Sequence, residues 1–104
     1  MASNNNNVQL KSGHQVENVA GTAHNTPNNS STWKEHFQKH AYNGWPSACA
    51  RLGCNRRATD GAHVRVQGKG YEVFILPLCH PCNQDKKGAF PVDNTEVVKV
   101  IVGK

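Results

Sequence analysis

The sequence lacks the run of about 20 apolar residues that a membrane-spanning helix needs. It also has no secretory-type apolar segment and no Arg-rich amphipathic pattern near its start, so we expect an intracellular, reducing compartment, the cytoplasm, and no membrane partner. Acidic residues are scarce, 7 against 12 lysines and arginines, which gives a formal charge of +5. This positive charge permits contact with nucleic acid but does not require it.

Large apolar side chains are nearly missing from residues 1–31, which are rich in asparagine. The large aliphatic residues of this stretch are Val8, Leu10, Val16 and Val19. Such a segment buries too little apolar surface to offset the entropy lost on ordering its backbone. We therefore predict a disordered Asn-rich tail over 1–31 and one folded domain over 32–104. A domain this short usually needs a disulfide, a metal ion or oligomerisation to be stable.

Four cysteines can supply that stabilisation, in a CxxxxC pair at Cys49 and Cys54 and a CxxC pair at Cys79 and Cys82. In a reducing compartment such pairs favour a metal ion, and the alternative is two disulfides. Two short-spaced pairs are typical of a tetrahedral Zn²⁺ site. Four thiolates leave no open position for water, so we predict a structural and not a catalytic Zn²⁺. His80 is a weaker ligand candidate.

The segment that follows the tail predicts a short helix. Thr32 and Glu35 have the spacing of a capping box, and an Asn-Gly pair near residue 44 stops the helix. The apolar stripe of this helix consists of Trp33, Phe37 and Ala41. We expect the stripe to pack on the core, and the alternative is a ridge that binds a protein partner. We expect His36 and His40 to be exposed.

Strands are predicted on both sides of the turn sequence at 67–70, because residues 62–66 alternate and residues 71–76 are apolar and rich in β-formers. A short helix follows Cys82, and the valine-rich segment 95–103 predicts a third strand. Gly53, between the first two cysteines, predicts a tight turn that folds the backbone over a metal ion.

The sequence "GAHV" on the first strand, followed by "LCHPCN" at the start of a helix, resembles the treble-clef ββα unit of the HNH endonucleases (the His-Me finger, or ββα-metal, family) over residues 47–90. Over residues 32–104 the chain is also similar to short microbial proteins of unassigned function. The resemblance implies a small α+β fold, a zinc-stapled ββα unit with an N-terminal helix and a C-terminal strand.

The same resemblance implies two catalytic residues. His63 matches the general base, and Asn83 matches the position that holds the catalytic Mg²⁺ or another divalent ion. The motif is degenerate, since Ala62 stands where many members have a metal-binding aspartate and the loop asparagine has no counterpart. Asp60 or Asp85 could replace the aspartate, although the spacing does not place either of them at the site.

We therefore expect a zinc-binding module that contacts DNA or RNA. We favour a protein without enzymatic activity. The residues expected to contact nucleic acid are Arg56, Arg57, Arg65, Lys69, Lys86 and Lys87. One alternative is an active divalent-metal-dependent endonuclease with His63 and Asn83 in its site. Another is a protein–protein adaptor that uses the aromatic helix or the edge of the last strand.

Overall fold

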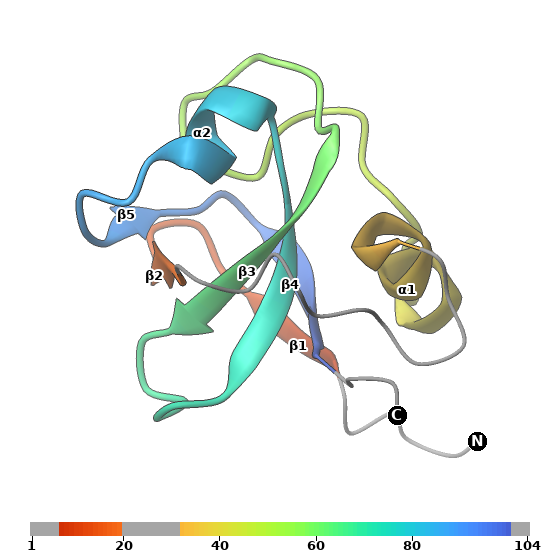
Figure 1. Ribbon diagram of the computed structural model, residues 1–104, viewed down its shortest axis with the longest axis horizontal. Coiled ribbons are helices and arrows are strands. Elements are labelled where there is room, and N and C mark those ends of the chain that lie inside the picture. The colour runs from red at the N-terminus through yellow and green to blue at the C-terminus, as the bar shows by residue number, and fades with distance from the viewer. Residues whose placement is uncertain (1–6, 20–31, 101–104) are drawn as a thin grey trace.

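The computed structural model describes residues 7–19 and 32–100 (Figure 1). These residues form a six-stranded antiparallel sheet and two short helices. None of the helices in the described part is long and apolar enough to cross a membrane. The elements in chain order are β1 Asn7–Leu10, β2 Gln15–Asn18, α1 Trp33–His40, β3 Asp60–Val66, β4 Val73–Leu78, α2 His80–Gln84, β5 Phe90–Pro91 and β6 Thr95–Lys99.

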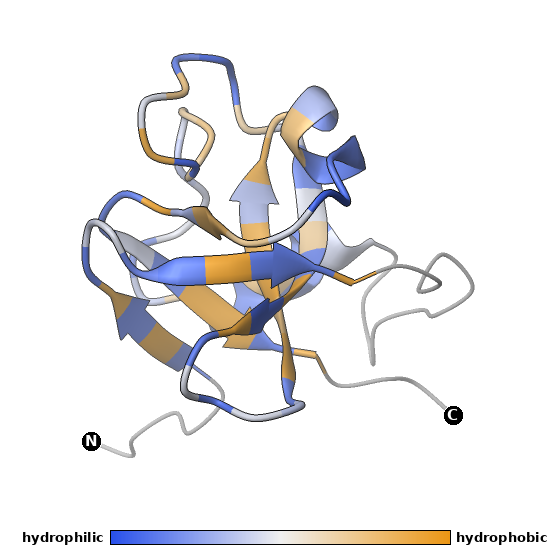
Figure 2. Ribbon diagram, turned by 90° about the vertical axis from the view of Figure 1, so that its left-hand side faces the viewer, coloured by the Kyte–Doolittle hydropathy of each residue, from blue (hydrophilic) through white to orange (hydrophobic). Residues whose placement is uncertain are grey.

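The sheet has the strand order β1-β6-β4-β3-β2-β5 and curls into a half-barrel around one apolar core. Strands from across the sheet contribute to this core, among them β1 with Leu10, β2 with Val16 and β4 with Leu76. Figure 2 shows hydrophobic and hydrophilic residues alternating along several strands. This period of two places every second side chain on the concave face.

Helix α1 covers part of the opposite, convex face of the sheet. Phe37 of α1 packs there with Ile75 of β4 and Val98 of β6, all three at most 1% exposed. The close approach depends on Gly61 of β3, because a Cβ atom at that position would lie 3.0 Å from backbone atoms of Trp33 and Lys34. The helix therefore rests directly on the backbone of β3.

The predicted disordered tail is wrong for residues 7–18. β1 pairs with β6, and β2 pairs with β3 and β5. Leu10 is 5% exposed and Val16 is 1% exposed, so the few apolar residues of this stretch are the ones that enter the core. Each strand is too short to be stable alone, and its partners lie far away in the sequence. Residues 1–6 and 20–31 of the predicted tail lie outside the described residues.

The predicted fold class, a small α+β treble-clef ββα unit, is also wrong. The predicted hairpin exists as β3 and β4, but it lies in the middle of a sheet that is completed by β1, β2, β5 and β6. The two helices are short, eight residues in α1 and five in α2, and the structure is mainly antiparallel β. Three strands, β1, β2 and β5, were not predicted from the sequence, and together with β6 they extend the hairpin into a half-barrel.

Local predictions for α1 are confirmed in part. The Thr32 side chain accepts a hydrogen bond from the Glu35 backbone N–H at 3.0 Å, as a helix cap does. The predicted exposure of His36 is wrong, since it is fully buried against the sheet and its Nε2 lies 3.1 Å from the Lys99 carbonyl oxygen. His36 belongs to the same face as Trp33, three residues earlier on the helix.

Candidate metal centre

Cys49 and Cys54 lie on a loop between α1 and β3 that folds back on itself. The Cys49 backbone N–H donates to the Arg56 carbonyl at 2.8 Å, and the Cys54 N–H donates to the Arg51 carbonyl at 3.0 Å. Gly53 adopts a φ of 82°, a left-handed conformation that glycine reaches without strain. The tight turn predicted between the two cysteines is therefore present.

Cys79 and Cys82 come from the end of β4 and from α2. Cys79 caps α2, and its carbonyl accepts the Asn83 backbone N–H at 3.0 Å. The Asn18 side chain of β2 donates to the Cys82 carbonyl at 2.8 Å, so the second pair is attached to the sheet as well. Pro81 in the first turn of α2 suits a position where no backbone N–H is needed.

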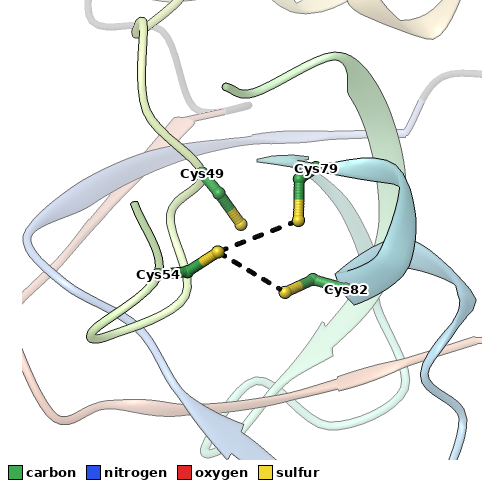
Figure 3. Close-up of side chains that lie close together, drawn as sticks. All are labelled: Cys49, Cys54, Cys79 and Cys82. Atoms are coloured by element: carbon green, nitrogen blue, oxygen red, sulfur yellow. Dashed lines mark hydrogen bonds between the residues drawn. The ribbon is translucent and has the colours of Figure 1, made fainter. Parts of the chain in front are cut away.

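The four sulfur atoms converge on a common centre (Figure 3). All of them lie within 4.8 Å of one another, with Cys54 Sγ 3.8 Å from Cys79 Sγ and 3.9 Å from Cys82 Sγ. These separations are too long for disulfides, and the four cysteines are free. A tetrahedral ion with metal–sulfur bonds of about 2.3 Å requires edges of about 3.8 Å. The cluster can therefore hold a metal ion such as zinc with little rearrangement.

The thiols differ in their tendency to ionise. Burial raises the pKa of the Cys49 thiol, and burial together with the Cys79 thiol raises the pKa of Cys82 to about 12. The Arg56 backbone N–H points at the Cys54 sulfur and lowers its pKa. Cys54 therefore ionises more readily than Cys49 or Cys82. A divalent ion supplies the charge that allows all four sulfurs to be thiolates.

Arg51, between the first two cysteines, supports the cluster from outside. Its guanidinium donates to the Asp85 carboxylate at 2.9 Å and lies over the Phe90 ring, 4.6 Å from the ring centroid. The hydrogen bond to the Asp85 carboxylate, helped by the Cys82 sulfur, raises the Arg51 pKa above its ordinary value and outweighs burial, which lowers it. The sequence alone does not predict this role, because the link to Asp85 depends on how α2 lies against the cysteine loop.

The two residues expected to be catalytic have different surroundings. His63 of β3 is only 7% exposed, and the Trp33 ring of α1 meets it edge-on at 4.8 Å between centroids. Its Nε2 is buried without a hydrogen-bond partner in the described part. Burial, helped by Lys86, lowers the pKa of His63 to about 4.

Asn83 lies instead near the surface, where it contacts the carboxylate of Asp60. Its side-chain amide donates to Asp60 Oδ2 at 3.0 Å, and His80 Nδ1 lies 2.8 Å from the same oxygen. Burial opposes ionisation of Asp60, but the hydrogen bonds from Asn83, His80 and Thr59 outweigh it and lower the pKa. His80, the weaker zinc candidate, thus faces Asp60 and is outside the sulfur cluster.

The six basic residues expected to contact nucleic acid fall into two groups. Arg56 and Arg57 follow Cys54, and Lys86 and Lys87 follow α2, so these four lie at the cysteine end of the molecule. Arg65 and Lys69 lie at the other end of the β3–β4 hairpin, where Arg65 stacks on the Tyr71 ring at 5.8 Å. Since seven residues of strand extend over about 20 Å, the two groups are not one patch.

Comparison of the chain with protein-family models, with curated proteins and with solved structures finds no match in any of the three. The resemblance to the HNH endonucleases therefore has no support from these comparisons.

Proposed function

We propose that this protein is a small non-catalytic module whose half-barrel is stapled by a structural Zn²⁺ and which binds DNA or RNA through the phosphate backbone. The sulfur geometry supports a structural zinc site, because four thiolates at tetrahedral spacing close the coordination sphere of the ion. Zinc bound in this way reduces the formal charge from +5 to +3, which remains positive.

The observation that carries nucleic-acid binding is the set of positive charges without negative partners. In the described part, ion pairs form between Arg51 and Asp85, His80 and Asp60, and Lys99 and Glu72. None of them involves the six expected contact residues. The two lysines and two arginines at the cysteine end are therefore available to phosphate groups.

The burial of His63 supports a binding module over a nuclease. A general base must lie within hydrogen-bond reach of the water that it activates, and Trp33 covers the face of β3 on which His63 lies. The Asn83 amide donates to the Asp60 carboxylate, and among the described residues no hydrogen bond joins either side chain to His63.

A protein adaptor was suggested by the apolar stripe of α1 and by the edge of the last strand. Both contact other parts of the same fold. The apolar stripe of α1 packs on the sheet, with Phe37 only 1% exposed. The last strand, β6, lies between β1 and β4 and has no free edge along its paired residues.

Fluorescence anisotropy with a labelled single-stranded oligonucleotide and a labelled duplex tests this function. The zinc-loaded full chain should bind both, and log K should fall linearly with log salt by about 0.7 to 0.9 for each phosphate contact. Lys86→Glu combined with Lys87→Glu should weaken binding, whereas Lys99→Glu, at a residue paired with Glu72, is the matched control. Absence of binding to either probe at low salt would refute nucleic-acid binding.

A further inference from the structure

A hollow of about 500 Å³ lies between α1 and the turn that carries the first two cysteines. We refer to it as the Lys34–Arg57 hollow. Lys34 comes from the first turn of α1, and the other walls come from the segments on either side of Cys49 and Cys54. The residues that define the hollow are Lys34, Trp45, Pro46, Ser47, Asn55 and Arg57.

The lining of this hollow is cationic. It contains two permanent positive charges, Lys34 and Arg57, and no carboxylate. Neither cation forms an ion pair with a residue of the described part, and the Lys34 ammonium instead lies 5.1 Å from the centre of the Trp45 ring. Two like charges beside one concave surface raise the local concentration of anions. Ser47 and Asn55 add uncharged polar groups that can orient such an anion.

The walls of the hollow are held by contacts that do not depend on a ligand. The Trp45 indole N–H donates to the Ala58 carbonyl at 2.9 Å, and its ring packs edge-on against Phe37 at 5.4 Å. A β-bridge joins Ala48 to Arg57 directly beside Cys49, and the Ala58 N–H donates to the Ser47 carbonyl at 3.0 Å. The backbone of Arg57 is thus fixed by the same turn that positions the metal ligands, which lowers the entropic cost of binding.

We propose that the Lys34–Arg57 hollow binds one nucleotide unit of a nucleic-acid strand, with a phosphate between the Lys34 ammonium and the Arg57 guanidinium. The planar guanidinium can donate two parallel hydrogen bonds to phosphate oxygens, and the ammonium adds a point charge. Trp45 and Pro46 provide an apolar wall for the sugar or base. The volume lies within the usual range of small-ligand sites. This inference rests on the proposed function and assigns it a specific contact.

The direct test uses two-dimensional NMR of the zinc-loaded full chain. AMP and inorganic phosphate are titrated separately, and the Trp45 indole N–H and the Arg57 backbone N–H report on the hollow. Both ligands should shift these signals in a saturable way, and AMP should bind more tightly because it also contacts the apolar wall. Saturable shifts confined to the β3–β4 hairpin would contradict the proposal.

Substitutions then connect the hollow to the strand. Arg57→Gln and, as an independent variant, Lys34→Gln should each weaken binding of a single-stranded oligonucleotide about tenfold at low salt and reduce the salt slope by about 0.7. Lys99→Gln is the matched control, because Lys99 pairs with Glu72 and is not among the expected contact residues, and we expect less than a twofold change. Circular dichroism and zinc content establish that each variant is folded.

The outcomes separate this inference from the proposed function. If the oligonucleotide binds and the Arg57 and Lys34 variants behave like Lys99→Gln, nucleic-acid binding stands and the hollow is not its site. If AMP shifts the hollow but no oligonucleotide binds, the proposed function is wrong and a strand is not the ligand. If the Arg57 and Lys34 variants lose oligonucleotide binding and the control variant does not, both nucleic-acid binding and the role of the hollow are supported.

Discussion

Replacing Glu96 with Gln should destabilise the fold strongly, because Glu96 is a buried carboxylate that joins three segments. It lies on β6 and is 4% exposed. Its oxygens accept hydrogen bonds from the Asn7 side chain of β1 at 2.5 Å and from the backbone N–H groups of Tyr42 and Asn43 at 2.8 and 3.1 Å. The residue therefore attaches both β1 and the loop after α1 to β6.

The size of the effect follows from these donors. A hydrogen bond to a charged acceptor contributes about 1.5–3 kcal/mol, against about 1 kcal/mol for a neutral pair. Gln keeps the shape but removes the charge and turns one acceptor oxygen into a donor. That group then faces an N–H group, and the buried donor left without a partner costs about 1–3 kcal/mol. We expect Glu96→Gln to lower the free energy of unfolding by about 2–3 kcal/mol.

Urea unfolding of the zinc-loaded protein at pH 7, followed by circular dichroism, measures this change. Glu72→Gln is the matched control, because Glu72 is about half exposed and pairs with Lys99 at 2.9 Å on the surface. Exposed pairs of this kind contribute at most about 1 kcal/mol. If Glu96→Gln cost no more than Glu72→Gln, the reasoning about the buried carboxylate would be refuted.

Three further changes test other parts of the structure. Gly61→Ala should cost about 1–3 kcal/mol in the same unfolding assay, because the new Cβ atom meets the backbone of α1 at 3.0 Å, and unchanged stability would show that α1 does not rest on β3. His63 has a folded pKa of about 4, below its ordinary value near 6.5, so its contribution to stability is fully present above pH 6.5 and is lost as the pH falls toward 4. The stability gap between wild type and His63→Leu should therefore shrink by about 2 kcal/mol from pH 7 to pH 5, and a gap independent of pH would contradict the burial of a neutral imidazole. Arg51→Gln should lower zinc affinity about tenfold in a chelator competition, with Arg65→Gln as control, and equal affinities would remove Arg51 from the support of the cluster.

Some features of the fold could be predicted because their signals are local. The spacing within each cysteine pair predicted that each pair would bind one edge of a tetrahedron, and the four sulfurs do converge. The capping box at Thr32 predicted the start of α1, and the turn residues at 67–70 predicted the hairpin. Each of these predictions depends on residues that lie within one turn or one short cysteine-containing loop.

The rest depends on partners that are distant in the sequence. β1 contains only four residues, and it is a strand because Asn7 to Leu10 pair with residues near the other end of the chain. The composition of residues 1–31 alone therefore predicted disorder where the structure has two strands. The burial of His36 follows from the docking of α1 on β4 and β6, which no local pattern specifies.

The candidate site shows the same division. Cys49, Cys54, Cys79 and Cys82 were found from spacing, whereas the contact of Asp60 with Asn83 joins the start of β3 to α2. The resemblance to HNH endonucleases suggested a catalytic role for His63 but did not predict that α1 would cover it. The cationic hollow was missed because Lys34 and Arg57 come from segments that only the fold brings together.

One zinc ion bound by four thiolates should hold the half-barrel together, and metal analysis combined with chelation tests this role. The purified full chain should contain one zinc per molecule, and its thiols should react with a thiol reagent only after a strong chelator is added. Removal of the ion, or Cys79→Ala, should abolish the cooperative unfolding transition, because metal binding supplies folding free energy here. A metal-free protein with four reactive thiols and an unchanged unfolding transition would show that no metal ion holds the fold together.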